Sequence, residues 1–184
     1  MKIFGIDPGS LRTGYGCVET DGTRHRVVAC GAVRTPVLGS FADRLLAVHT
    51  SLAAVIADVR PDCVAIESLF HAANIRSALK LGHARGVAML AAAQAGVPVV
   101  EYTPAEIKRA VVGYGRAEKP QVQQMVKLLL GLTDVPSPHD VADALAVAIC
   151  HVHSRPPERV ARALVPPRGA GRGATSWRSY RPAR

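Results

Sequence analysis

The first 34 residues contain three strand-like stretches joined by short connections, and this arrangement constrains the fold more than any other feature. Apolar and β-branched residues dominate three runs, at 2–6, 14–19 and 26–33. The first connection lies within the glycine-rich segment GIDPGSLRTGYG (residues 5–16), and the second contains the turn-forming pair Asp21-Gly22. Strands on such short connections pair with their chain neighbours, so we expect an antiparallel three-stranded meander.

Helical and strand patterns alternate in the rest of the chain. Helical spacing of apolar residues spans 41–59 and 73–95, and three further helices are predicted at 104–112, 119–130 and 139–152. Two more strands are predicted, at 63–66 and 97–102. Because the helix at 41–59 is a crossover, the strand at 63–66 should lie parallel to one of the first three. The sequence therefore predicts an α/β fold, with a mixed five-stranded sheet flanked by helices.

Charge is concentrated at the C-terminal end of the chain. The 184 residues carry a net charge of +9, and the eight arginines and one glutamate of residues 154–184 account for +7 of it. This segment is also rich in proline and glycine, and it has no helical or strand periodicity. We predict one domain over 1–153 and a disordered basic tail over 154–184. Such a tail either adds salt-sensitive phosphate contacts or is a solvated appendage without a role.

Other sequence features indicate the compartment. No apolar run approaches the roughly 20 residues that a membrane helix needs, and the N-terminus lacks the apolar centre of a signal peptide. The four cysteines are far apart, which favours buried free thiols over a zinc site or disulfides. We therefore expect a cytoplasmic protein without membrane contact.

Acidic residues stand at positions where ordinary capping does not explain all of them. Asp7 and Glu67 each directly follow an apolar strand, at the carboxyl ends where functional crevices open in such sheets. Asp140 and Asp143 begin an apolar helix and lie about 60° apart on one face. Carboxylates about 4 Å apart repel by roughly 4 kcal/mol at an effective dielectric of about 20. Gathered together, these groups need protons or a divalent cation, and all-oxygen ligation suits Mg²⁺ or Mn²⁺ rather than zinc.

Five segments of the chain resemble the RuvC family of Holliday junction resolvases. They are GIDPGSLRTGYG at the start, AIESLF at 65–70, SALKLGHARG at 77–86, PAEIKRAVVGYGRAEKPQV at 104–122 and HDVADALAVAICH at 139–151. The resemblance runs in order over residues 1 to 153. Family chains are expected to end soon after the last helix, so it does not cover the tail.

The resemblance implies an RNase H-like fold and a homodimeric, Mg²⁺-dependent endodeoxyribonuclease. Such an enzyme is structure-selective and makes paired symmetric nicks in four-way DNA junctions during bacterial recombination and repair. The family's four carboxylates match Asp7, Glu67, Asp140 and Asp143, which would hold two ions, with Mn²⁺ able to replace Mg²⁺. The branch-migration proteins RuvA and RuvB are the implied partners.

The matched segments also imply DNA contacts. Phe70 lies in a polar loop, where the family's aromatic residue stacks on a base. Lys108 and Lys119 match family lysines near the active site. Arg76, Lys80 and Arg85 follow along the next helix, and a solvated helix face explains these three equally well. The small residues of that helix suit either an internal core or a dimer interface.

Histidines near the last helix have simpler explanations. His139, beside Asp140, is either a ligand or proton carrier or just an exposed residue at a helix start. We expect His151 and His153 at the surface, too distant from His139 for one metal site.

Three other functions fit parts of the sequence. The carboxylates are common to other RNase H-like nucleases, which act on RNA or on an RNA–DNA hybrid. The D-x-G loop also resembles the phosphate loop of the actin and sugar-kinase superfamily. Finally, the arginine-rich tail would suit a nucleic-acid binder without enzymatic activity, although four convergent acids would repel phosphate in such a protein.

Overall fold

The computed structural model describes residues 1–9, 11–35, 39–68 and 75–154. Its strands are β1 (Lys2–Asp7), β2 (Arg12–Thr20), β3 (His25–Arg34), β4 (Cys63–Glu67) and β5 (Val99–Tyr102). Its helices are α1 (Phe41–Val59), α2 (Ile75–Gln94), α3 (Pro104–Val112), α4 (Lys119–Leu129) and α5 (His139–Ser154). This order confirms the predicted α/β fold.

The five strands form one mixed sheet in the order β3-β2-β1-β4-β5. β1, β2 and β3 pair antiparallel, whereas β4 lies parallel to β1, and β5 lies parallel to β4. The meander and the crossover predicted from the sequence are therefore confirmed. β5 begins two residues later than expected, because the N–H of Val97 still bonds to Ala92 at the end of α2, and Pro98 has no N–H for a sheet.

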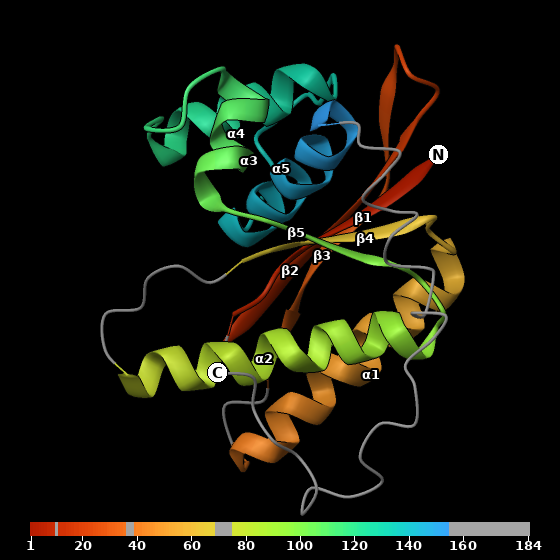
Figure 1. The fold of residues 1–184 in the computed structure, drawn as a ribbon, viewed down its shortest axis with the longest axis vertical. Helices are drawn as coiled ribbons and strands as arrows, with labels where there is room; N and C mark the ends of the chain where they lie inside the picture. The colour runs from red at the N-terminus through yellow and green to blue at the C-terminus, as the bar shows by residue number, and fades with distance from the viewer. Residues whose placement is uncertain (10, 36–38, 69–74, 155–184) are drawn as a thin grey trace, which may run out of the picture.

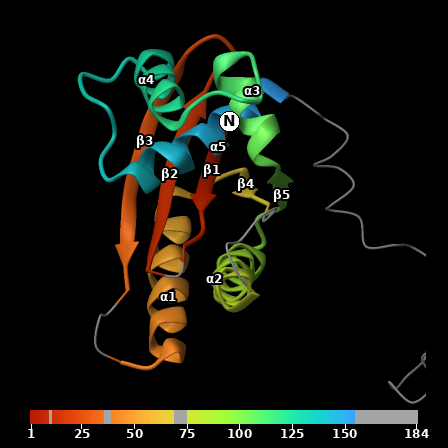
Figure 2. The ribbon, with the colours of Figure 1, turned by 90° about the vertical axis from the view of Figure 1, so that its left-hand side faces the viewer.

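Helices cover both faces of the sheet (Figures 1 and 2). α3, α4 and α5 lie on one face and α1 and α2 on the other, each over its own apolar core. Side chains alternate between these cores along a strand, so Ile3 faces α5, whereas Phe4 and Ile6 face α1 and α2. On β4, Ala65 faces α5, and Ile66 faces the opposite side.

Two glycines allow α5 to lie directly on the middle of the sheet. A Cβ atom on Gly5 would be 2.0 Å from the carbonyl oxygen of Ala144, and a Cβ on Gly14 would be 2.0 Å from that of Asp140. No other residue type fits at such close approach. The first two turns of α5 are therefore held against β1 and β2.

Two expectations about single residues are wrong. Cys30 is exposed, because it lies on β3, an edge strand that pairs only with β2, whereas the other three cysteines are buried. His151 is only 4% exposed, and its Nδ1 lies 2.9 Å from the hydroxyl of Tyr102, while burial lowers its pKa. His153 is exposed, as expected.

In the part of the chain that the structure describes, no helix is both long enough and apolar enough to cross a membrane.

Candidate active site

The ends of β1 and β4 bring two carboxylates to the same face of the sheet. Ile6 and Ile66 are partners in the parallel ladder. Asp7 and Glu67 are the next residues of these two strands, so they lie next to each other at the strand ends. Alternation along each strand turns both side chains away from the α1–α2 core and toward α5. The strands thus place two acids side by side under the first turns of α5.

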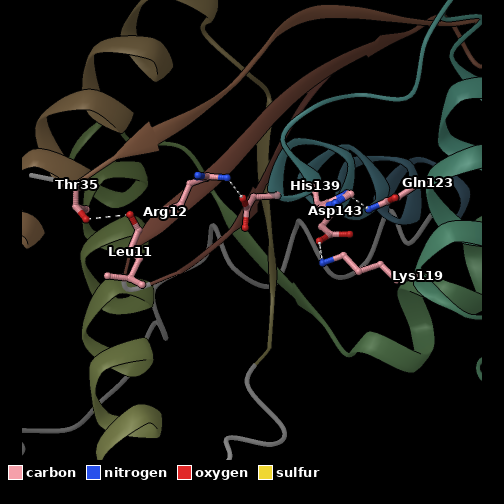
Figure 3. Close-up of polar contacts among 8 residues, drawn as sticks. Leu11, Arg12, Thr35, Lys119, Gln123, His139 and Asp143 are labelled. Atoms are coloured by element: carbon pink, nitrogen blue, oxygen red, sulfur yellow. Dashed lines mark hydrogen bonds and ion pairs between the residues drawn. The ribbon is translucent and has the colours of Figure 1, made fainter. Parts of the chain in front are cut away.

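α5 adds the other two acids, each paired with a cation from a different element. Nη1 of Arg12, on β2, lies 3.3 Å from Oδ2 of Asp140. Nζ of Lys119, the first residue of α4, lies 2.6 Å from Oδ2 of Asp143. Figure 3 shows Arg12 and Lys119 reaching toward this helix start from opposite directions.

The electrostatic environment shows that the four acids interact. The pKa of Asp7 is raised from 3.8 to about 8, mainly by burial and then by the charges of Asp143, Glu67 and Asp140, in that order. The pKa of Glu67 is also raised, by burial and by Asp143, against the lowering effects of Lys119 and Lys108. A carboxyl group in such surroundings is unfavourable as an isolated anion, so this site favours a proton or a cation.

A pocket of about 290 Å³ opens beside these side chains. Its polar lining consists of Asp7, Glu67, Asp143, Lys108 and Lys119, and its other walls are Pro104, Ile107, Val122 and Ala146. Asp140 is outside this lining. Partial burial alone would lower the pKa of Lys119, but the hydrogen bond to Asp143 and the nearby carboxylates raise it. Lys119 therefore stays charged at the pocket.

The donor set suits a hard divalent cation, since all four side chains offer oxygen. Among the described residues, no three His, Cys, Asp or Glu side chains lie close enough together to hold a metal ion as they stand. Asp140 and Asp143 contact Arg12 and Lys119 instead.

The remaining predicted residues have different surroundings. Arg76 and Lys80 are exposed on α2, whereas Arg85 is largely buried and contacts β4 and β5. His139 is exposed, and its Nδ1 lies 2.9 Å from Nε2 of the buried Gln123 (Figure 3). Phe70 lies outside the described residues.

Sequence reasoning missed Arg12 as a member of this site. Its signal was present within GIDPGSLRTGYG, because a residue near the start of β2 must lie close to the end of β1 in an antiparallel pair. Its partner, Asp140, is 128 residues away in the chain, so the pairing itself could not be read from local pattern.

Comparison with known proteins supplies the family. A sequence profile described as crossover junction endodeoxyribonuclease RuvC matches residues 3–151. The chain belongs to the RuvC family. The RuvC of Heliobacterium modesticaldum is 58% identical over 154 residues, which cover 84% of this chain and 95% of that relative. The RuvC of Trichlorobacter lovleyi is 50% identical over 182 residues, or 99% of this chain and 100% of that relative.

The second of these relatives corrects one expectation. Because its alignment covers 99% of this chain and therefore includes most of residues 154–184, a RuvC chain does not have to end soon after the last helix. Among solved structures, Thermus thermophilus RuvC in complex with a Holliday junction substrate matches with a TM-score of 0.80 and 37% identity. The match covers 84% of this chain and 94% of that one. The family and the RNase H-like fold predicted from the sequence are therefore confirmed.

Proposed function

We propose that this RuvC-family chain is a divalent-metal-dependent endodeoxyribonuclease that makes paired symmetric nicks in four-way junction DNA. Its curated relatives are described as crossover junction endodeoxyribonucleases, and a solved relative is bound to a Holliday junction substrate. The observation that carries the proposal is one pocket in which Asp7, Glu67 and Asp143 meet two lysines.

Asp7, Glu67, Asp140 and Asp143 are the proposed ligands of two Mg²⁺ ions, with Mn²⁺ as a substitute. When bound, such ions activate a water and shield the negative charge of the phosphate and of the leaving oxygen. Asp7 would be the ligand that the others surround, since it lines the pocket with Glu67 and Asp143 and the charges of all three other acids raise its pKa. Asp140 and Asp143 must exchange their contacts with Arg12 and Lys119 for contacts with a cation.

Lys108 and Lys119, which line the same pocket, are the proposed contacts to the DNA backbone. Once Asp143 turns away from it, Lys119 is free to contact a DNA phosphate, and Lys108 lines the pocket from α3. Both charges would bind the backbone without reading its sequence. Phe70, Arg76 and Lys80 remain predicted DNA contacts, and Arg76 and Lys80 are exposed on α2. We also propose that the nuclease domain comprises residues 1–153 and that the basic tail at 154–184 adds phosphate contacts.

We also propose that two copies of the chain pair through α2. Beside its buried alanines, α2 presents a separate apolar stripe that includes Leu79 (59% exposed) and Leu90 (50% exposed). Gly82 and Gly86 lie between these leucines with open space above them, so a second helix can approach closely. A two-fold axis here would give the dimer two sites for the two strands of a symmetric junction.

The family resemblance supports two further assignments. RuvA and RuvB are the proposed partners that supply and move the junction. The proposed location is the bacterial cytoplasm, where a chromosomal junction would be the substrate.

The test is cleavage of a synthetic mobile four-way junction in Mg²⁺, beside a linear duplex and an RNA–DNA hybrid. We expect paired nicks in the junction alone, no cleavage after chelation, and a loss of at least about 10²-fold in rate for Asp7→Asn. Asp58→Asn, at an exposed site on α1, is the matched control and should cleave normally. Preferential cleavage of the hybrid, or an Asp7→Asn rate within a few-fold of wild type, would contradict the proposal.

A further inference from the structure

Arg85 connects α2 to the strand end that carries Glu67. Its Nε donates a hydrogen bond to the main-chain carbonyl of Glu67 over 3.2 Å. Its Nη2 forms an ion pair with the carboxylate of Glu101 on β5. The side chain is only 18% exposed, so it lies against the sheet. Arg85, for which the sequence left a DNA contact and a solvated helix face as alternatives, therefore has its guanidinium directed toward the sheet.

The end of β4 needs such a contact. The ladder between β1 and β4 ends at the pair Ile6–Ile66, and Pro8 after β1 has no N–H to extend it. On the other side, the N–H of Ser68 bonds to the carbonyl of Tyr102 over 2.8 Å. Arg85 thus supplies a donor for the last carbonyl of β4, beyond the end of its ladder with β1.

We propose that Arg85 is a positioning residue for Glu67. By holding the carbonyl of Glu67 and anchoring itself on Glu101, the planar guanidinium fixes the main-chain orientation at the end of β4. That orientation directs the Glu67 carboxylate into the pocket with Asp7. This inference rests on the proposed function, and it assigns Arg85 a role in metal binding and cleavage rather than in holding DNA.

Three variants separate this role from a DNA contact. Arg85→Gln removes the ion pair and the fork geometry, and Arg85→Lys keeps the charge but cannot hold a carbonyl and a carboxylate in the same way. Glu101→Gln keeps the bond from Arg85 to Glu67. Lys80→Gln, at an exposed position of the same helix, is the comparison for a positive charge lost at a predicted DNA contact.

The measurements are the single-turnover cleavage rate at saturating protein, the junction Kd in EDTA, and Mn²⁺ binding to the DNA-free protein by electron paramagnetic resonance. For both Arg85 variants we expect about 10- to 100-fold losses in rate and in Mn²⁺ affinity, with the junction Kd within two-fold of wild type. Glu101→Gln should lose less than Arg85→Gln, and Lys80→Gln should keep its Mn²⁺ affinity.

Two results would overturn the inference. One is an Arg85→Lys protein with wild-type rate and Mn²⁺ affinity, and the other is a weakened junction Kd with an unchanged rate at saturation. Thermal melting identifies any variant that fails to fold, and Glu101→Gln with Arg85→Lys then decides the question. A wild-type protein that does not cleave the junction would instead contradict the proposed function, while Mn²⁺ affinity still tests the role of Arg85.

Discussion

Replacing Gly14 with alanine tests whether the close approach of α5 to the sheet sets the geometry of the acids. Gly14 is the ladder partner of Asp7, and an added Cβ would lie 2.0 Å from the carbonyl oxygen of Asp140. An ordinary contact between carbon and oxygen is about 3.3 Å or longer. The first turn of α5 must therefore withdraw by roughly 1.3 Å, which carries Asp140 and Asp143 away from Asp7.

This displacement has two measurable effects. Overpacking of this kind lowers the free energy of unfolding by about 1–3 kcal/mol, and each kcal/mol lowers Tm by roughly 2–4 °C in a chain of this size. A misplacement of about 1 Å in a catalytic group lowers a rate by about 10²-fold. We therefore expect Gly14→Ala to fold, to melt several degrees lower, and to cleave the junction about 10²-fold more slowly.

Gly16→Ala is the matched control. Its added Cβ would meet the side chain of Leu145 at 2.5 Å, and a flexible side chain yields more easily than a helix backbone. This variant should lose stability by a similar mechanism but keep most of its cleavage rate. The assay is single-turnover cleavage of a four-way junction in Mg²⁺, with Tm measured on the same samples. A folded Gly14→Ala protein that cleaves within about three-fold of wild type would refute the reasoning.

Four further outcomes are expected. The folded pKa of Asp7, about 8, exceeds the unfolded value of 3.8, so the metal-free folded protein keeps a proton that the unfolded chain has lost. Its free energy of unfolding should therefore fall as pH rises from about 4 to about 8 in chemical denaturation, and Asp7→Asn should flatten this slope; an equal slope in both proteins would contradict it. Since a metal ligand must lose its proton, the Mg²⁺ concentration for half-maximal cleavage should fall as pH rises toward about 8, and a constant value would count against Asp7 as a ligand. Arg12→Gln removes a half-exposed cation from Asp140, so this Mg²⁺ requirement should drop by up to about five-fold in a metal titration, whereas a higher requirement would mean that Arg12 assists binding. Leu79→Glu should turn the dimer into a monomer in sedimentation analysis, with the metal-free Tm little changed, and a persistent dimer would place the interface elsewhere.

Sequence pattern was sufficient for the elements and for the positions of Asp7 and Glu67 in the sheet. Period-two alternation in KIFGID assigns Asp7 to the same face as Ile3 and Gly5, and the same rule assigns Glu67 to the face of Ala65. The crossover helix then required β4 to be parallel to an earlier strand, which brings the two strand ends to one edge. These conclusions were accessible because alternation, turns and crossover handedness depend on near neighbours in the chain.

Pattern failed where exposure depends on distant segments. His151, at the end of a helix, was expected at the surface, but β5 and its Tyr102 cover it. Cys30, in an apolar run, was expected to be buried, but its strand lies at the edge of the sheet. In both cases the local sequence correctly predicted helix or strand. The exposure of the side chain depended instead on which distant segment packs against that element.

The amino-acid sequence by itself determined the order of helices and strands and the family, and it predicted four acids as ligands of a cation. Only the tertiary structure decided that α5 lies on Gly5 and Gly14, that Arg12 pairs with Asp140, and that Arg85 reaches the carbonyl of Glu67. The physical reason is that secondary structure follows from hydrogen bonds and periodicity within a few residues. The distances between charged groups instead follow from how closely whole elements pack. That packing depends on residues far away in the chain, such as Gly14 under α5 and Arg85 beside β4.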